Sequence, residues 1–452
     1  MQTSQQRRRD ALQIWRAAVD AVSPARLLRD ALHVEGSTLV AREQRFELLP
    51  TARVVIVGAG KAGAGMALAV EDVLGPEFLH RHRVTGWVNV PEDCVRPTRC
   101  VHLHAARPPG VNEPTAAGVA GSEEILRLVG ALGPDDLCLC LISGGGSALM
   151  PAPAEGVTLA EKLALTRHLS AAGANIEELN TVRKPLSRIK GGGLARACRA
   201  GRLLSLIISD VLGDPLSIIA SGPTVTETPS PQAALAVLER FQVRAKGIAP
   251  QAIAYLEQQA KSTIIKPTGC APSVTNLVIG NNALAVAAAA DEARRLGYHP
   301  ATASAARSEG AAEEIGRNLA GAALRMRDGT VENCLISGGE PVVTLVEAGR
   351  RGLGGRNQQL VLAALERLTA LPFFPAGIVL LSGGTDGEDG PTDAAGAVLD
   401  ASIAADARER RLDAADYLAR NDAYHFFEPL GALIKTGPTH TNVCDVRVVL
   451  RA

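Results

Sequence analysis

The strongest chemical signal in this sequence is a glycine-rich turn that follows an apolar run. Leu137 to Ile142 is continuously apolar, which is typical of a strand buried on both faces. The next five residues are Ser143, Gly144, Gly145, Gly146 and Ser147. A glycine-rich turn between a strand and a helix lets a ligand approach the backbone and leaves N–H groups free to bind it. We therefore predict that this turn binds an anion, most simply a phosphate, and that a helix starts near Ala148.

The Ser-Gly-Gly sequence recurs twice more after short apolar runs. One copy leads from Ser337 to Glu340, and the other leads from Ser382 to Asp386. In open α/β sheets, ligands bind beyond the carboxyl ends of the strands, so we expect the three turns to form the walls of one site. Glu340 is then a candidate metal ligand, and Asp386, the first acid after its strand, is a candidate for the chemistry.

An earlier segment, Gly58 to Gly63, satisfies the G-x-G-x-x-G pattern between a predicted strand at Val54 to Val57 and an alanine-rich helix. This pattern is the fingerprint of dinucleotide binding, but no clear acidic residue ends the next strand. Lys61 also occupies the place where the backbone should approach a pyrophosphate. An ammonium there can meet phosphate oxygens directly. A nicotinamide site, a phosphate-directed lysine and a solvated lysine on a tight turn all remain open at this point.

Other charged residues follow predicted strands or flexible glycines. Arg356, in GLGGRNQQ, starts a predicted helix, where a guanidinium can clamp a carboxylate or a phosphoryl group. Asp210 and Asp214 flank a strand end and could hold a divalent metal, with turn formation or helix capping as the alternative. Thr385 to Asp393 carries four carboxylates, whose mutual repulsion calls for a cation. His440 stands alone and is better interpreted as a hydrogen-bonding residue.

Composition excludes several functional classes. The 452-residue chain is 46% hydrophobic and 21% charged, with zero formal net charge and 3% aromatic residues, so we expect no nucleic-acid binding. No apolar run reaches the ~18 residues that span a bilayer, so we expect no membrane association. The eight cysteines form no C-x-x-C pair and are expected to be buried, reduced thiols. The basic N-terminus lacks the apolar core of a secretory signal, and we expect a cytoplasmic protein.

Strands separated by helix-length segments recur over nearly the whole chain, which predicts a parallel α/β organisation in both halves. The length favours two domains, and we place them at residues 1–250 and 251–452. Near the N-terminus, Asp10 to Leu32 predicts one or two amphipathic helices. Trp15 lies on their apolar stripe and is expected to serve packing.

Taken together, these motifs resemble the glycerate 2-kinase family, which joins an N-terminal glycerate-kinase-like domain to a C-terminal domain with a MOFRL region, here about 330–445. The shared motifs, in order, are VGAGKAG, SGGGSAL, NTVRK, IKGG, SDVLGD, IASGPT, SGGE, GGRNQ, GTDGEDGPTDAAGA and TGPTHTNV. The resemblance implies an α/β protein with a Rossmann-like, largely parallel sheet in its N-terminal domain, a smaller α/β C-terminal domain and an active site in the cleft between them. The implied reaction transfers the γ-phosphoryl group of ATP to the 2-hydroxyl of D-glycerate with Mg²⁺, and a homodimer is a candidate assembly.

On this resemblance, Lys61 and Arg356 match functional basic residues and Asp386 matches a cleft acid. We expect the two basic side chains to stabilise charge on the transferring group and Asp386 to accept or orient the hydroxyl proton. The remaining predicted site residues are Lys190 with Ser143 to Ser147 for nucleotide phosphates, Gly60, Arg183 and Asn357 for substrate, and Asp210 and Glu340 for Mg²⁺.

Two departures and two alternatives accompany this interpretation. Pro185 stands where the family is expected to have a histidine, and Gln359 stands where glutamate is commoner. One alternative is an NAD(P)H-dependent hydroxypyruvate reductase that binds its cofactor at Gly58 to Gly63. The other is a sugar-phosphate sensor that binds its ligand without turning it over.

Overall fold

The computed structural model describes residues 3–262, 271–326 and 332–451 and divides into two compact units. The N-terminal unit is Leu27–Ile279; the C-terminal unit combines residues up to Arg26 with those from Gly280 onward. This division differs from the predicted boundary after residue 250. Strand β9 (Ser273–Gly280) joins the sheet of the N-terminal unit. Helix α1 (Ser4–Ala21) instead buries its apolar stripe against the C-terminal unit.

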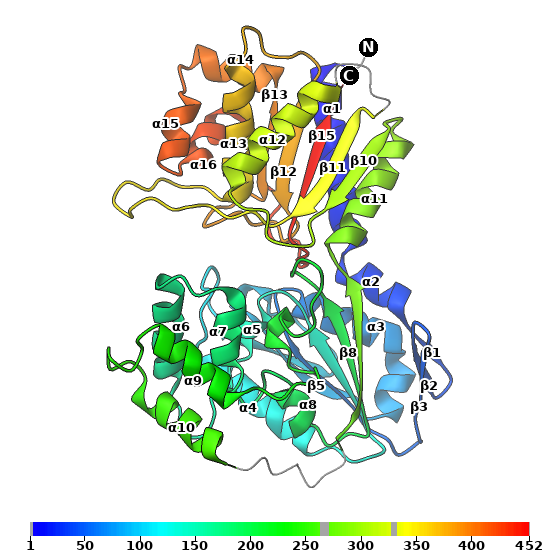
Figure 1. Ribbon diagram of the computed structural model, residues 1–452. Helices are drawn as coiled ribbons and strands as arrows, with labels where there is room; N and C mark the ends of the chain where they lie inside the picture. Colours follow the sequence, from blue (N-terminus) through cyan, green and yellow to red (C-terminus); the bar gives the residue numbers. More distant parts are fainter. Residues whose placement is uncertain (1–2, 263–270, 327–331, 452) are drawn as a thin grey trace. The chain divides into compact units, whose positions relative to one another are not determined.

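A six-stranded sheet forms the centre of the N-terminal unit (Figure 1). Its strand order is β6-β5-β4-β7-β8-β9. Its first five strands in that order are mutually parallel. Their bounds are β4 (Val54–Ala59), β5 (Thr85–Pro91), β6 (Val101–Arg107), β7 (Leu137–Ile142) and β8 (Arg202–Ile208). Every residue of β4 and β7 is buried, as their continuous apolar runs predict. The predicted largely parallel sheet is therefore confirmed.

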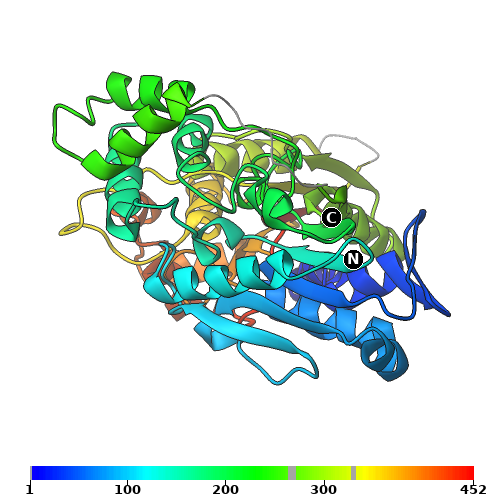
Figure 2. The same ribbon diagram turned by 90° about the horizontal axis from the view of Figure 1, so that it is seen from below.

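Helices and a small antiparallel sheet complete this unit. Its helices are α2 (Pro24–Ala31, which crosses the boundary), α3 (Gly63–Arg81), α4 (Ala116–Gly130), α5 (Gly146–Leu149), α6 (Leu159–Ala171), α7 (Ile176–Arg183), α8 (Gly193–Ala197), α9 (Pro231–Arg240) and α10 (Pro250–Lys261), with 3₁₀ turns η1 (Glu92–Cys94) and η2 (Ile219–Ser221). The small sheet is β1 (Leu32–Glu35), β2 (Thr38–Ala41) and β3 (Gln44–Glu47). Helices α6, α7, α9 and α10 gather around an apolar core of their own (Figure 2). The helix predicted from Ala148 is only the four-residue α5.

The C-terminal unit has a mixed sheet in the order β10-β11-β15-β12-β13-β14. Its strands are β10 (Pro300–Ser304), β11 (Cys334–Gly339), β12 (Val379–Gly384), β13 (Gly396–Asp400), β14 (Leu433–Ile434) and β15 (Asp445–Leu450). Among the strand pairs of this unit that the structure describes, only β10 and β11 are parallel, because β15 inserts antiparallel between β11 and β12. Strand β13 follows β12 without a crossover helix and therefore also pairs antiparallel. The prediction of a parallel organisation in this half was wrong.

Helices pack on this sheet, and α1 contacts β15, β12 and α11. The helices of the unit are α1, α11 (Asn282–Arg295), α12 (Ala312–Arg325), α13 (Arg356–Thr369), α14 (Ala401–Glu409), α15 (Ala414–Ala419) and α16 (Ala423–Phe427), with the 3₁₀ turn η4 (Glu428–Leu430). Helix α13 lies against β12 and β13 and against α12.

Two of the three predicted Ser-Gly-Gly turns are strand. Ser337 to Gly339 ends β11 and Ser382 to Gly384 ends β12, and both pair with β15. Their glycines make room for neighbouring side chains. A Cβ at Gly383 would lie 2.8 Å from the indole nitrogen of Trp15, which donates a hydrogen bond to the Gly383 carbonyl at 3.1 Å. Trp15 therefore serves packing, as predicted, and the glycines of these two segments lie in strands and not in turns.

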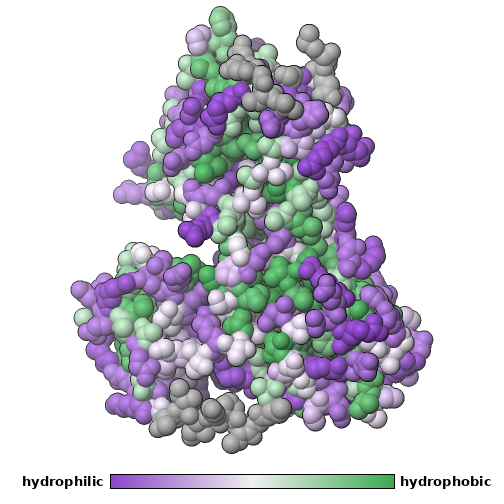
Figure 3. Space-filling model, turned by 45° about the vertical axis from the view of Figure 1, so that its right-hand side comes forward, coloured by the Kyte–Doolittle hydropathy of each residue, from purple (hydrophilic) through white to green (hydrophobic). Residues whose placement is uncertain are grey.

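Hydrophilic side chains are spread over the visible surface of both units, with smaller hydrophobic patches among them (Figure 3). Among the described residues, no helix is both long and apolar enough to cross a membrane. The structure gives no disulfide among the seven cysteines in the described ranges, and all of them except Cys100 are buried. Cys270 lies outside the described residues.

Candidate functional site

The glycines of the G-x-G-x-x-G segment serve contacts within the protein. A Cβ at Gly58 would lie 2.0 Å from the carbonyl oxygen of Leu141, and one at Gly60 would lie 2.0 Å from Ser143 Oγ. Gly60 also has φ +151°, a conformation that favours glycine. The turn after β4 thus packs directly on the end of β7 and on the glycine-rich turn that follows it.

The backbone donors of the same turn are used by the protein as well. The N–H of Gly60 donates to the Asn89 carbonyl at 3.2 Å, and the N–H of Lys61 donates to the Gly144 carbonyl at 2.8 Å. The N–H of Ala62 donates to Ser143 Oγ at 3.0 Å. A dinucleotide fingerprint would offer such groups to a pyrophosphate. Here they fix the turn against residues 143–144 instead, and they hold the backbone that carries Lys61.

The glycine-rich turn itself keeps donors available. Gly145 is left-handed, with φ +79°, and within the described residues the N–H groups of Gly144 and Gly145 donate no hydrogen bond. Two basic side chains lie beside it: a Cβ at Gly145 would be 3.4 Å from Arg107 Nη2 and 3.6 Å from Lys61 Cγ. Arg107, at the end of β6, is buried and belongs to no motif that the sequence offers.

Three predicted residues lie together at Ser147, the last residue of the predicted turn. Lys190 Nζ donates to the Ser147 carbonyl at 2.7 Å and to Ser147 Oγ at 2.5 Å, and Arg183 Nη2 donates to the same Oγ. Ser147 Oγ also lies 3.0 Å from Ser221 Oγ, which donates to Asn180 Oδ1 at 3.0 Å. The structure therefore brings Ser147, Arg183 and Lys190 together.

This cluster places two basic side chains close together in a partly buried site. Burial lowers the pKa of Lys190 well below its ordinary value, and the charge of Arg183 lowers it further. Burial also lowers the pKa of Arg183. Among the described residues, no acidic side chain pairs with either of them, whereas neighbouring Lys184 bonds Glu227 at 2.7 and 2.9 Å. A bound anion would relieve this imbalance.

Asp210 lies near the end of β8, two residues after Ile208, as the sequence predicts, and is partly buried. Within the ranges that the structure describes, no group of three His, Cys, Asp or Glu side chains is arranged to hold a metal. Mg²⁺ in phosphate-transfer sites commonly takes one or two carboxylates and completes its shell with water and phosphate oxygens. A single carboxylate at a strand end fits that requirement, so the assignment of Asp210 stays a prediction.

In the C-terminal unit, Arg356 is the first residue of α13, and its side chain binds two acidic residues. Its Nε and Nη2 donate to the two carboxylate oxygens of Asp445 at 2.7 and 3.0 Å, and its Nη1 donates to Glu340 at 2.8 Å. Burial opposes the charge of Arg356, yet Asp445 and Glu340 hold its pKa above the ordinary value. Burial and the charges of Asp445 and Asp386 raise the pKa of Glu340 against the pull of Arg356. Glu340, a predicted Mg²⁺ ligand, thus has Arg356 as its partner here.

Asp386 lies in the same cluster. A Cβ at Gly384 would be 3.0 Å from Asp386 Oδ1 and 3.6 Å from Asp445 Oδ1, so the two carboxylates flank one glycine. The N–H of Glu388 donates to Asp386 Oδ1 at 3.1 Å. Asp445 is fully buried. It was not predicted as a site residue, although only Cys444 separates it from the TGPTHTNV motif.

The acidic loop before β13 distributes its carboxylates among different partners. Asp389 accepts the N–H groups of Asn357 and Gln358 at 2.9 and 2.8 Å and so caps α13. Burial, with the charge of Asp445, raises the pKa of Asp389 to about 7. Asp393 instead accepts from Lys435 at 2.9 Å. The repulsion expected from the sequence is therefore relieved by backbone donors and a lysine.

Asn357, a predicted substrate contact, is buried and engaged by the protein. Its Oδ1 accepts from Ser382 Oγ at 2.5 Å, and its Nδ2 donates to Asp389 at 3.2 Å. Gln359, one of the two departures from the family, is also buried and donates to Glu313 at 2.9 Å and to the Leu418 carbonyl at 3.1 Å. A glutamate could make neither bond in its ionised form.

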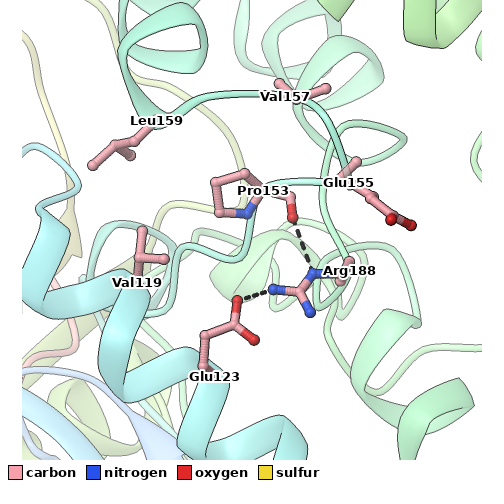
Figure 4. A pocket seen from close by; sticks show the side chains of 8 residues that line it. Val119, Glu123, Pro153, Glu155, Val157, Leu159 and Arg188 are labelled. Carbon is pink, nitrogen blue, oxygen red and sulfur yellow. Dashed lines mark hydrogen bonds and ion pairs between the residues drawn. The ribbon is translucent and has the colours of Figure 1, made fainter.

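A separate pocket of about 570 Å³ opens in the N-terminal unit (Figure 4). Arg188 crosses it, donating to the Pro153 carbonyl at 3.0 Å and pairing with Glu123. The other residues that line it are Val119, Ala154, Glu155, Val157 and Leu159. None of the predicted site residues lines this pocket, so it is not part of the cluster at Ser147.

Comparison with known proteins agrees with the order of motifs. Residues 10–257 match a domain family described as of unknown function, DUF4147, and residues 333–445 match the MOFRL family. A human protein named glycerate kinase is 39% identical over 97% of this chain and 92% of its own length. The D-glycerate 2-kinase of Thermotoga maritima is 35% identical over 97% of both chains.

A third relative carries a different name. It is a putative hydroxypyruvate reductase of Agrobacterium vitis, 37% identical over 96% of this chain and 95% of its own length. Among solved structures, the glycerate kinase of Thermotoga maritima superposes with a TM-score of 0.82 at 33% identity, covering 99% of this chain and 100% of the other.

Proposed function

We propose that this chain, which belongs to the glycerate kinase family that joins a DUF4147 domain to a MOFRL domain, phosphorylates D-glycerate on its 2-hydroxyl with ATP. The products are 2-phosphoglycerate and ADP. The observation that carries the proposal is the cationic cluster at Ser147, where Arg183 and Lys190 converge without an acidic partner among the described residues. Both substrates of such a kinase are anions, so a site of this charge is what they require.

Phosphoryl transfer depends on positioning and charge stabilisation. The 2-hydroxyl oxygen attacks the γ-phosphorus, the bond from that phosphorus to the β,γ-bridging oxygen breaks, and the hydroxyl proton passes to a base. We assign the free N–H groups of Gly144 and Gly145, with Lys190, to nucleotide phosphates. Lys61 and Arg356 would stabilise charge on the transferring group.

Asp386 is our candidate for the base, since it follows the end of β12 and its carboxylate lies beside Gly384 together with that of Asp445. When bound, Mg²⁺ would neutralise phosphate charge, and Asp210 is the residue we assign to it. The cytoplasmic location and the homodimer remain predictions.

The reductase alternative rests on the name of one relative and on the G-x-G-x-x-G segment. The backbone N–H groups of that segment donate hydrogen bonds to Asn89, Gly144 and Ser143. Its glycines pack against β7 and the turn after it. It therefore lacks the free donors that a nicotinamide dinucleotide needs. The kinase is the better-supported function.

The test is a turnover assay on purified protein with two arms. One arm supplies D-glycerate, ATP and Mg²⁺, follows ADP and feeds the product to enolase, which uses 2-phosphoglycerate directly. The other supplies hydroxypyruvate with NADH or NADPH and follows nicotinamide absorbance. We expect ADP release with immediate enolase consumption. ADP without enolase consumption would place the phosphoryl group on the 3-hydroxyl, and nicotinamide oxidation without ADP would establish the reductase.

A pair of adjacent lysines provides a control for the site. Lys190→Met should reduce kcat/KM at least ~10²-fold, because it removes a charge that faces the bound anion. Lys184→Met removes a lysine that Glu227 already neutralises, so its effect should be small. Binding of the substrates without any turnover would favour the sensor alternative.

A further inference from the structure

One basic residue near the cluster belongs to none of the motifs. Lys162 lies on α6, partly buried, and its Nζ donates to the Leu186 carbonyl at 2.6 Å. Leu186 belongs to the short segment between Arg183 and Lys190. The lysine therefore holds the backbone of the segment that presents both cations to Ser147.

Helix α6 is itself fixed at its start, so this anchor has a defined position. Thr158 and Glu161 form a reciprocal capping box there, and Glu161 also accepts the N–H of Gln251 at the start of α10. Lys162 thus links α6, through its backbone, to the Arg183–Lys190 segment, through the hydrogen bond of its ammonium group.

The charges around Lys162 are mostly positive or already paired. Burial, and then the charge of Arg183, lower the pKa of Lys162 to about 7, and Lys162 in turn lowers the pKa of Lys190. The charged groups on its own helix and on the two helices packed against it have these partners: Glu161 with Thr158 and Gln251, Arg167 with Glu113, His168 with the Phe241 carbonyl, Glu178 with Arg240, Lys184 with Glu227, and Glu257 with Arg244. Glu177 and Lys261 are exposed on α7 and α10. No carboxylate in the described part of the chain pairs with Lys162.

We propose that Lys162 is a positioning residue of an oxyanion site at Ser147: it holds the Arg183–Lys190 segment and adds a third positive charge toward a bound carboxylate or phosphate group. The identity of the anion rests on the proposed function, in which D-glycerate supplies the carboxylate and ATP supplies the phosphates. Three cations close together repel one another until an anion binds. Binding should therefore favour the protonated form of Lys162, and the protein should take up a proton with the anion.

The test is isothermal titration calorimetry at pH 8 in two buffers that differ in ionisation enthalpy, which yields the number of protons taken up. Separate arms titrate D-glycerate, a non-hydrolysable ATP analogue and inorganic phosphate into the full chain. Since the pKa of free Lys162 lies near 7, we expect an uptake of roughly 0.5–1 proton with the anion that occupies the site. The arm in which it occurs distinguishes a carboxylate site from a phosphate site.

Three variants separate a charge effect from a structural one. Lys162→Met should remove the share of the proton uptake that Lys162 contributes, roughly 0.5–1 proton, and weaken binding ~10-fold or more. Lys162→Arg should restore affinity without that share, because arginine stays charged. Lys184→Met, the matched control next to Arg183, should keep the uptake. The KM of D-glycerate in wild-type protein should rise between pH 7 and 9, and this rise should be absent in Lys162→Arg.

The outcomes distinguish the two proposals. If the protein turns over substrate but binds the anion without proton uptake, or if Lys162→Met leaves the uptake undiminished, the role of Lys162 is overturned and the kinase proposal stands. Failure of all three anions to bind would overturn the oxyanion site. Proton uptake that depends on Lys162 in a protein without turnover would support the site and refute the kinase.

Discussion

Arg356 permits a test that separates what it contributes to stability from what it contributes to catalysis. Asp445 is fully buried, and Arg356 holds both its oxygens and one oxygen of Glu340. Breaking a buried ion pair by removing one partner typically costs 3–5 kcal/mol. Because the Arg356 side chain is 33% exposed, we expect the lower end, about 3 kcal/mol, for Arg356→Met.

The decrease in the free energy of unfolding should be measured for the C-terminal unit alone, since a chain with two units need not unfold in one step. The sequence has two tryptophans, Trp15 in this unit and Trp87 in the other. In a Trp87→Phe background, Trp15 becomes the single reporter. It is buried and bonded to β12, which pairs with the strand that begins at Asp445. Urea unfolding followed by Trp15 fluorescence then measures the free energy of the relevant unit.

The double variant supplies the decisive comparison. Asp445→Asn in the Arg356→Met background removes the uncompensated charge, so the double variant should recover about 2 kcal/mol relative to Arg356→Met. Turnover should not recover if Arg356 also stabilises the transferring phosphoryl group. An unchanged Trp15 transition in Arg356→Met would refute the stabilising role of the pair. Recovery of turnover in the double variant would refute the catalytic one.

Three further changes test neighbouring parts of the interpretation. Lys61→Ala should lower turnover by ~10²-fold or more with an unchanged circular dichroism spectrum, because the turn is held by its backbone. Gln359→Glu should cost about 2 kcal/mol at pH 8 by facing Glu313 with a second carboxylate, and less at pH 5, in the same Trp15 assay. The pKa of Asp389 is raised in the folded chain, so its contribution is complete below about pH 4 and is lost as the pH rises through 7. Urea unfolding at several pH values should therefore show a decline of up to about 3 kcal/mol between pH 5 and 8 that Asp389→Asn removes.

The strands of the N-terminal unit could be predicted from sequence because burial on both faces leaves a continuous apolar run. The bounds of β7 agree with the run from Leu137 to Ile142. The same reasoning failed at Ser382 to Gly384, where glycine signals close packing and not a turn. Gly383 makes room for Trp15, a residue more than 360 positions away. Local sequence does not distinguish a glycine required by a turn from one required by a distant side chain.

The residues of the candidate site also fall into those that local sequence predicts and those that it does not. Ser147, Arg183 and Lys190 stand in or beside recognisable motifs and were predicted. Arg107 and Lys162 were missed because each reaches the site from a separate element, with no glycine or repeated pattern around it. Asp445 was missed for a related reason: it pairs with Arg356 across 89 positions, and a single acid at a strand start carries no local signal.

The charge balance within each unit gives these residues a chemical meaning that the motifs alone do not. In the N-terminal unit, Arg183 and Lys190 share one serine and have no acidic partner in the described residues, so an anion is the group whose binding this cluster favours. In the C-terminal unit, Arg356 is the cation between Asp445 and Glu340, so a base or a metal is favoured there. Phosphoryl transfer needs both environments, one for the phosphates and one for the hydroxyl proton. Competitive inhibition by inorganic phosphate that weakens in Lys190→Met, but not in Lys184→Met, would assign the first environment to the anion.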